Sequence, residues 1–387
     1  MMASGCVIFT ADEETPWFRD PYLARLPDGS LCCAFLTGGG CDGAIRNVVA
    51  GIRSDDDGSS WSEAEVFMEL PDRACSVTSL FRSVDTAYLF CVSSVEGHRY
   101  RKQTHVLATG SDGRTFSRDH VVADRWVTER GVDIRNGTHL LDGRALLPAA
   151  WLEPIGEFDP DTWRSSKELN HRYGNFGWGG VAQNNIYCVG VVEPNGDFTQ
   201  FSRSGRICKE TPGSELPCQP IFEPTIAVLS ETRLAMLIRG DMSNRLWRSD
   251  SEDGGRTWSE LRITDIPNPG SQPRIVNLPD GRIVLFHNPN EKDYDDTRPE
   301  ASHGYRTPLE MWVSTDGLQT WSAKTSLESA PRVAMYPDAF YEAGSEEIYL
   351  VWESGPPAGS GEQIYFQRIC VRDLEDRSSG PGVPVDG

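Results

Sequence analysis

Two apolar runs followed by a polar turn form the clearest pattern along the chain. The runs IFEPTIAVL (221–229) and LAMLIRGD (234–241) each have the length of a β-strand and are bounded by turn residues. The turn that follows has five residues at fixed offsets: Ser251, Asp253, Gly255, Thr257 and Trp258. The aspartate oxygen of such a turn accepts nearby N–H groups, the glycine takes a positive φ and the tryptophan covers the strands. The pattern predicts an antiparallel β unit.

The same turn recurs along the chain. Clear copies begin at Ser54, Ser251 and Ser314, and weaker copies begin at Thr109 and Glu193. In the copy at Ser314 the glycine is replaced by Leu318. The starts lie 55 to 63 residues apart, except for one interval of 84 residues that leaves room for an insertion. Such spacing is typical of four short strands per unit.

A second motif precedes these turns and marks the hairpin between the first two strands of a unit. It reads LPDG at 26–29, LLDG at 140–143, LSET at 229–232 and LPDG at 278–281. Four strands per unit, repeated radially, describe a β-propeller. We therefore expect an all-β fold, a six-bladed β-propeller with units at about 17–62, 63–117, 118–202, 203–260, 261–322 and 323–372.

The two ends of the chain and one insertion complete this picture. The opening CVIFT (6–10) is expected to form the outer strand of the last blade and close the ring, giving one domain over residues 1–372. Residues 373–387 lack an apolar period and are expected to be disordered. The insertion at 152–185 carries aromatic residues, and long loops of this kind are usually functional or disordered.

Composition argues against several classes of partner and cofactor. The formal net charge of −20 disfavours nucleic acid and anionic membrane surfaces. No apolar run approaches a membrane span of roughly 18 residues, and the start does not resemble a signal peptide, so a cytoplasmic location is expected. The ten cysteines lack paired CxxC spacing, so reduced thiols without a metal or cofactor are expected, with Cys208 and Cys218 as the one plausible local disulfide.

Charged residues within apolar runs mark the candidate site. The innermost strands of a propeller line its central channel, so polar side chains on or beside them converge. Five residues meet this description: Arg19 in WFRDPYLARL, Glu223, Arg239, Arg306 in HGYRTPLEMWVS, and Tyr336 in VAMYPDAFY. Alternatively, Arg239 and Arg306 form only ion pairs with Glu223 or Glu310, and Tyr336 is an ordinary half-buried aromatic residue.

The turns look like Asp-boxes, and residues 17–370 resemble the sialidase (neuraminidase) superfamily of six-bladed propellers, which includes glycoside hydrolases. The arginine triad of that family matches Arg19, in FRDP, together with Arg239 and Arg306. The resemblance implies that Tyr336 and Glu223 form the nucleophile pair. It also implies an acid/base aspartate, for which the nearest match is Asp42 in GGGCDGAIRN (38–47).

The chemistry of this set is consistent with a retaining exo-glycosidase that acts on sialic acid or a related carboxylated sugar. Three converging guanidiniums bind a carboxylate because each offers a charged, planar fork of donors. A neutral phenol at Tyr336 avoids the repulsion that a carboxylate nucleophile would meet from such a substrate. Glu223 would take the phenol proton, and Asp42 would protonate the leaving oxygen.

Some residues depart from the family pattern. Asp20 replaces an apolar residue after the first arginine, and Asp338 follows the tyrosine. Both are expected near the anion site, where they would pair with Arg19 or Arg46 and change which sugar fits.

Two further functions stay open, and both use an acidic glycan as partner. The first is a uronate-directed polysaccharide lyase with His171 or Tyr173 as base, and the second is a glycan-binding propeller without activity. His139 is expected to be a rim or core histidine. The chain is expected to be a monomer.

Overall fold

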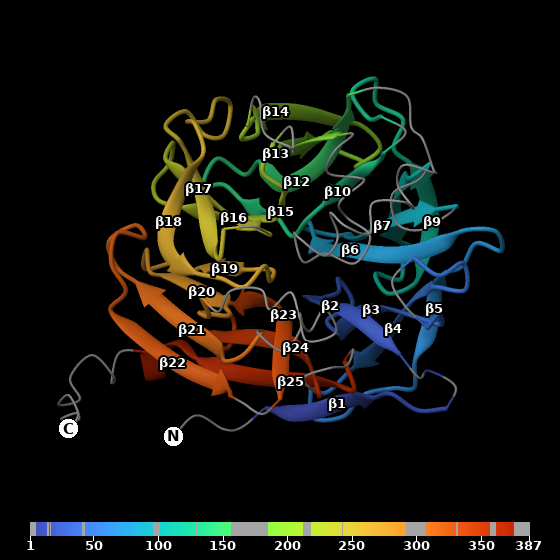
Figure 1. Ribbon diagram of the computed structural model, residues 1–387. Coiled ribbons are helices and arrows are strands. Elements are labelled where there is room, and N and C mark those ends of the chain that lie inside the picture. Colours follow the sequence, from blue (N-terminus) through green and yellow to red (C-terminus); the bar gives the residue numbers. More distant parts are fainter. Residues whose placement is uncertain are drawn as a thin grey trace.

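The structure is a computed structural model that describes residues 5–13, 15, 17–40, 43–95, 101–128, 130–155, 185–211, 218–241, 243–291, 306–329, 332–356 and 361–374. Within these ranges the chain forms six sheets that surround a common centre (Figure 1). The fold is therefore an all-β, six-bladed propeller, as the repeats predicted. Asp42, His171, Tyr173 and most of the predicted insertion and tail lie outside the described residues.

Each blade is an antiparallel sheet whose strands follow one another from the channel outward. The first two blades are β2 (Phe18–Arg25), β3 (Leu31–Thr37), β4 (Val48–Ser54) and β5 (Glu65–Met68), then β6 (Ala74–Arg82), β7 (Ala87–Ser94), β8 (Gln103–Thr109) and β9 (Phe116–Val121). The next two are β10 (Val132–Ile134), β12 (Ala145–Pro154), β13 (Asn185–Pro194) and β14 (Phe201–Ile207), then β15 (Ile221–Val228), β16 (Leu234–Gly240), β17 (Arg245–Ser251) and β18 (Arg262–Pro267). A short strand, β11 (Thr138–His139), also pairs with β12.

The last two blades complete the ring. They are β19 (Arg274–Asn277), β20 (Ile283–His287), β21 (Leu309–Ser314) and β22 (Ala323–Glu328), then β23 (Val333–Glu342), β24 (Glu347–Gly355), β25 (Gln363–Cys370) and β1 (Cys6–Thr10). The N-terminal strand β1 thus lies on the outer edge of a sheet formed by the C-terminal part of the chain (Figure 1). A 3-10 helix, η2 (Val371–Leu374), follows β25, and its last residue is buried.

The hydrophobic core is divided among the interfaces between neighbouring blades. Six of the seven buried clusters within the described residues join the facing surfaces of two adjacent sheets. The seventh consists of Val333, Met335 and Tyr336 on β23. One of them packs Phe18 and Phe35 of the first blade against Tyr349 and Phe366 of the last. Because the first and last blades share this cluster as well as β1, the ring is closed by packing and by strand pairing.

The first five predicted units end too early along the chain. Each of these units stops just after a recurring turn, whereas the turn joins the third strand of a blade to its fourth. The turn at Ser251, for example, is followed by β18 in the same sheet. These outer strands were missed because several of them, such as β9, are short and exposed and carry no apolar alternation.

The recurring turns have a shared hydrogen-bond pattern. In the turn at Ser251, the serine hydroxyl accepts the N–H of Gly255 (2.9 Å), and Asp253 accepts the N–H (2.8 Å) and the hydroxyl (2.6 Å) of Thr257. Leu318 takes the glycine position of the last copy with a φ of 65° and donates its N–H to Ser314 in the same way (2.9 Å). The turn geometry therefore survives the loss of glycine.

The two cysteines considered for a disulfide are free thiols. The Cys218 sulfur is buried and accepts the backbone N–H of Tyr187 (3.1 Å), while Cys208 contacts Arg206 (3.2 Å).

Among the described residues, no group of three or more His, Cys, Asp or Glu side chains could hold a metal ion. In the same part of the chain, no helix has the length and apolar character of a membrane span.

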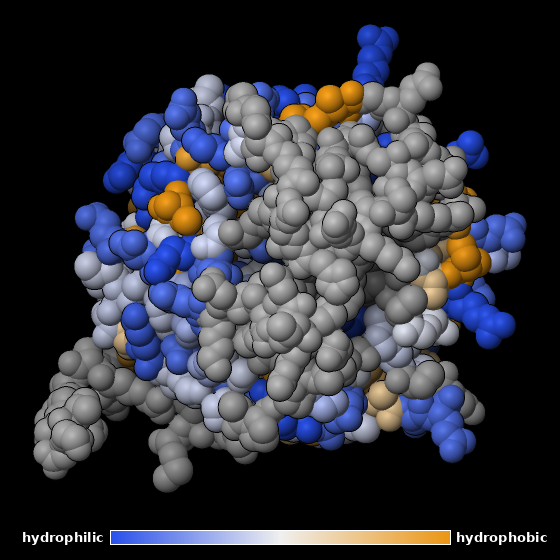
Figure 2. All heavy atoms as spheres, viewed as in Figure 1, coloured by the Kyte–Doolittle hydropathy of each residue, from blue (hydrophilic) through white to orange (hydrophobic). Residues whose placement is uncertain are grey.

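The exposed hydrophobic side chains are scattered. Figure 2 shows them as separate spots in a mainly hydrophilic surface, over the part of that face that is coloured. The most exposed are Val84, Leu141, Val66, Ile155 and Ile263. The coloured part of the face in Figure 2 shows no continuous apolar patch, and so gives no sign of a large apolar interface.

The turn aspartates predict an acid-sensitive contribution to stability. The Thr257 hydroxyl and backbone N–H groups lower the pKa of Asp253 to about 2. The stabilisation is present above the unfolded pKa near 4 and is lost as the pH falls toward 2. Asp253→Ala should therefore lower Tm by about 2 °C at pH 7, with a smaller deficit at pH 2.5. Asp72→Ala, at an exposed turn position, is the control, and equal effects of the two changes would contradict the prediction.

Candidate active site

Three innermost strands share one interruption of their register. On β2, β15 and β23 two consecutive residues oppose a single residue of the next strand. The first residue of each pair precedes a proline and has a positive φ: 55° at Asp20, 49° at Glu223 and 52° at Tyr336. Non-glycine residues rarely adopt this conformation, and bulges of this kind redirect a side chain. The three bulges therefore place a carboxylate, a carboxylate and a phenol at equivalent positions of three blades.

The three predicted arginines surround the phenol of Tyr336. The guanidinium carbons of Arg19 and Arg306 each lie 5.2 Å from the centre of the Tyr336 ring, and both groups approach the sulfur of Met335 (4.0 and 3.3 Å). Arg239, at the end of β16, donates from Nη1 to the Tyr336 hydroxyl (3.2 Å) and to Glu223 Oε2 (2.9 Å). The phenol and the carboxylate thus share one donor atom.

The arginines differ in how their charge is balanced. Arg19 forms a buried ion pair with Glu353 (Nε–Oε1 2.9 Å), and Arg239 pairs with Asp241 (2.7 Å) as well as with Glu223. Arg306 is also buried, but it donates to the carbonyl of Gly270 (2.9 Å) and has no carboxylate partner among the described residues. A buried cation without a counter-charge is costly. An anionic ligand would supply that counter-charge.

The phenol and the carboxylate are held in complementary protonation states. Burial and the charge of Glu223 raise the pKa of Tyr336 despite the opposing effect of Arg306 and Arg239. Burial also favours the protonated form of Glu223, but Arg239 and Arg135 together overcome it and lower the pKa of Glu223. At neutral pH the site therefore holds a neutral phenol beside an ionised carboxylate.

A fourth arginine reaches the site from the third blade. Arg135 directly follows β10, and its Nη2 lies 3.7 Å from Glu223 Oε1. Its Nη1 donates to the hydroxyl of Tyr22 (2.5 Å) and to Gln272 Oε1 (3.2 Å). Sequence reasoning missed this residue, although Arg135 is also a charged residue beside an apolar innermost strand.

Comparison with known protein families identifies the repeat. The family model for the BNR repeat-like domain matches residues 29–348. The chain belongs to this family. A comparison with curated protein sequences gave no significant match.

Solved structures share the fold of this BNR repeat-like chain at low sequence identity. The Hadza microbial sialidase Hz136 is 14% identical with a TM-score of 0.68, over 95% of this chain and 69% of its own. A leech intramolecular trans-sialidase in complex with 2,7-anhydro-Neu5Ac is 13% identical, with a TM-score of 0.68 over 97% and 72% of the two chains. A Dyadobacter fermentans protein of unknown function is 13% identical, with a TM-score of 0.67 over 96% and 99%. At such identities the similarity establishes the fold.

The expected position of Asp338 in this BNR repeat-like propeller is wrong. Its carboxylate does not pair with Arg19 or Arg46 but with Arg274 (3.0 Å), and it also accepts the amide of Asn136 (2.5 Å) and the backbone N–H of Leu23 (2.8 Å). The two-residue bulge lies between Met335 and Asp338, so simple alternation from Tyr336 does not give the direction of Asp338.

The structure also gives the positions of Asp20, Arg46 and Glu310, which the sequence analysis considered as neighbours or partners of the arginines. Asp20 is half-buried, donates its backbone N–H to Glu353 Oε2 (3.1 Å), and its charge contributes to raising the pKa of Tyr336. Arg46 is exposed on the loop between β3 and β4. Glu310, the alternative partner of Arg306, instead accepts the indole N–H of Trp312 (2.6 Å).

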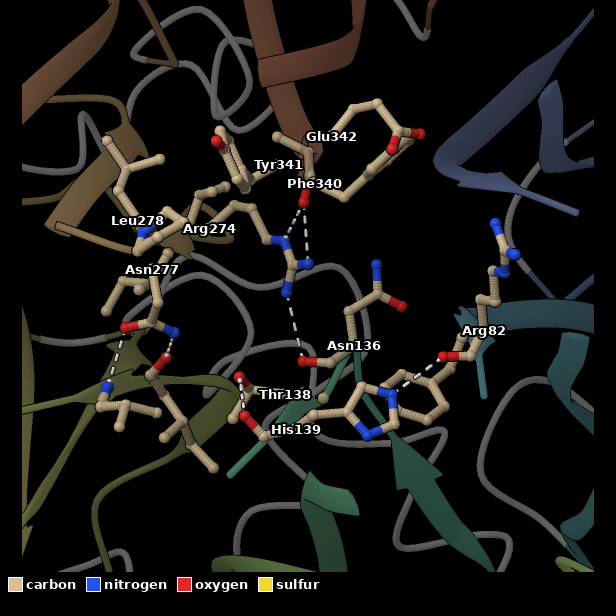
Figure 3. Close-up of a pocket in the computed structure, with 18 of the residues that line it drawn as sticks. Arg82, Asn136, Thr138, His139, Arg274, Asn277, Leu278, Phe340, Tyr341 and Glu342 are labelled. Carbon is tan, nitrogen blue, oxygen red and sulfur yellow. Dashed lines mark hydrogen bonds between the residues drawn. The ribbon is translucent and has the colours of Figure 1, made fainter. Parts of the chain in front are cut away.

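The opposite end of the channel holds a separate cavity of about 630 Å³, shown in Figure 3. The ends of β2, β15 and β23 line it, whereas Arg19, Glu223 and Tyr336 lie near the starts of the same strands. Its Arg274 donates to the carbonyls of Ala339 (2.8 and 3.0 Å) and Asn136 (3.2 Å) (Figure 3). His139 lines this cavity and bonds the carbonyl of Arg82 (3.1 Å) (Figure 3).

A serine–histidine–aspartate arrangement in the second blade is structural. Ser93 Oγ lies 2.9 Å from His105 Nε2, and His105 Nδ1 lies 3.2 Å from Asp119. Ser93 is completely buried, and its hydroxyl accepts Arg73 Nε (2.7 Å). A hydroxyl in this position has no access to a substrate, so the three residues connect strands β7, β8 and β9.

The unequal pairing of the arginines predicts opposite effects on stability. Arg306→Met should raise the free energy of unfolding by roughly 1 kcal/mol, because it removes a buried charge that has no ion-pair partner among the described residues. Arg19→Met should lower it by about 3–5 kcal/mol, because Glu353 is left buried and unpaired. Chemical denaturation of both variants at pH 7 measures the difference. Equal destabilisation by the two substitutions would show that Arg306 already has a counter-charge.

Proposed function

We propose that this chain is a retaining exo-glycosidase of the exo-α-sialidase type, which hydrolyses terminal sialic acid or a related carboxylated sugar from glycans. The observation that carries the proposal is the arrangement of Arg19, Arg239 and Arg306 around the phenol of Tyr336, with Arg306 lacking a carboxylate partner among the described residues. A substrate carboxylate would supply the missing charge and fix the sugar beside the nucleophile.

The first chemical step uses the residues that already share a donor. The Tyr336 oxygen forms a bond to the anomeric carbon while the bond from that carbon to the leaving oxygen breaks. Glu223 accepts the phenol proton, and the leaving oxygen takes a proton from an acid, for which Asp42 is our candidate. Asp42 lies outside the described residues.

The second step returns the enzyme to its starting state. Water attacks the anomeric carbon of the glycosyl–tyrosine intermediate, the carbon–phenol bond breaks, and the phenol oxygen regains its proton from Glu223. The acid that protonated the leaving oxygen now accepts a proton from the water. Two inversions at the same carbon give net retention.

The charge distribution explains why a phenol would serve as nucleophile. Asp20 and Glu223 both act electrostatically on Tyr336, and a third carboxylate at this position would add a negative charge close to the substrate carboxylate. A phenol with a raised pKa carries no charge when the substrate arrives. Binding of the substrate carboxylate would neutralise part of the arginine charge and so make Glu223 a stronger base during the reaction.

The fold comparison supports this proposal without deciding it. Two of the similar structures are a sialidase and an intramolecular trans-sialidase. His171 and Tyr173, the candidate bases of the uronate lyase, lie outside the described residues.

Loss of the Tyr336 hydroxyl tests the proposal. Tyr336→Phe should lower kcat on a fluorogenic sialoside by at least about 10³-fold, while affinity for the free sugar is retained because the arginines remain. Tyr341→Phe, on the same strand but lining the opposite cavity, is the matched control and should keep full activity. A Tyr336→Phe variant with wild-type kcat would disprove the proposed nucleophile.

A further inference from the structure

A network of hydrogen bonds and one ion pair connects Glu223 to residues of three other blades across the channel. Arg135 of the third blade contacts Glu223 of the fourth, Tyr22 of the first, and Gln272, which precedes the fifth. The Tyr22 hydroxyl in turn lies 3.3 Å from Gln272 Oε1. Tyr22 is completely buried and Gln272 nearly so, so these groups fix the position of the guanidinium.

The two oxygens of Glu223 face two different cations. Oε2 accepts Arg239 Nη1 (2.9 Å), which also bonds the Tyr336 hydroxyl, while Oε1 lies 3.7 Å from Arg135 Nη2. Arg239 shares its charge with Asp241. Among the described residues, Glu223 is the carboxylate within ion-pair distance of Arg135. Tyr22, Asp133 and Asp20 also act electrostatically on Arg135 from farther away or through a hydrogen bond.

We propose that Arg135 is a positioning residue that keeps the Glu223 carboxylate ionised and directed toward Tyr336; this inference rests on the proposed function. Without Arg135, a buried carboxylate would depend on a guanidinium that it shares with Asp241. The burial of Glu223 would then favour its protonated form, which cannot take a proton from the phenol.

Several charged and titratable groups face Glu223, and the test must separate Arg135 from them. Arg239 on β16, Arg306 before β21 and Arg135 act on Glu223 itself. Glu223 in turn acts on Tyr336 of β23 and Tyr22 of β2, while Asp20 of β2 and Asp133 of β10 act on Arg135. All but Arg135 stay in place in a single Arg135 variant. A shift seen in that variant is therefore assigned to this guanidinium.

The first measurement is the pH profile of kcat/KM on a fluorogenic sialoside. Loss of Arg135 makes Glu223 easier to protonate, so Arg135→Gln should move the acidic limb up by about one pH unit. That shift means about a tenfold loss on the acidic side and convergence with the wild type at higher pH. Arg135→Lys retains a cation and should restore part of the shift. A profile for Arg135→Gln with an unmoved acidic limb would overturn the inference.

The outer edge of the same blade offers a matched control. Arg203 on β14 lies 3.7 Å from Glu153, the same separation as that between Arg135 and Glu223. Arg203→Gln should leave the pH profile where it is, because this pair is remote from the phenol. An equal shift in both variants would show a general charge effect and would overturn the specific role of Arg135.

A second measurement does not depend on turnover. Arg135→Gln, Glu223→Gln and the double variant form a cycle of unfolding free energies, measured at pH 7 and pH 3. Arg135→Gln should cost more stability when Glu223 is present. This excess should shrink at pH 3, because that pH lies below the unfolded-state pKa of a glutamate, about 4.3. Zero coupling at pH 7 would overturn the inference. A wild-type chain without turnover would overturn the proposed function alone, and the cycle would then decide whether Arg135 holds Glu223 ionised.

Discussion

The candidate site depends on a backbone conformation that the side chains alone would not favour. Asp20, Glu223 and Tyr336 each adopt a positive φ immediately before a proline, although the residue before proline is normally extended. Each such residue costs on the order of 1–3 kcal/mol. The cost is sustained because the bulges lie on innermost strands between tightly packed blades. Six buried clusters hold those blades together, so the strands cannot relax individually.

One carboxylate connects the bulges to the electrostatics of the site. Glu353 on β24 uses one oxygen for the guanidinium of Arg19 and the other for the backbone N–H of Asp20. The ion pair that positions Arg19 therefore also supports the strained backbone next to it. Arg306 has no such carboxylate partner among the described residues and bonds a sulfur and a carbonyl instead. Among the described residues, the arginine without a carboxylate partner therefore lies on one side of the phenol, and the paired Arg19 and Arg239 complete its surroundings.

Much of the fold was predictable because its turns and hairpins recur along the chain. Residues of the candidate site were predictable only where a charged side chain interrupts an apolar strand. The recurring turns, clear or weak, and the hairpin motif before them predicted the six-bladed propeller. The outer strands such as β9 carry no apolar alternation and were missed. Glu223 stands out as a charge in an apolar run. Arg135 meets a similar criterion but follows a strand of three residues, which is too short to show a pattern.

The side chain of Asp338 points in a direction that strand alternation does not predict, because a bulge precedes it. Its observed contacts lie between the two ends of the channel. From β23 it contacts Leu23 of the first blade, Asn136 of the third and Arg274 of the fifth. Burial raises the pKa of this carboxyl, and Arg274 opposes the shift. These contacts cross the channel between the arginine site and the cavity in Figure 3. Leu23 follows the Asp20 bulge by three residues, and Asp338 follows the Tyr336 bulge by two. The hydrogen bond between Leu23 and Asp338 therefore fixes two of the three strained strands relative to each other. The polar residues at the centre of the ring therefore support the geometry of the site as well as its charge.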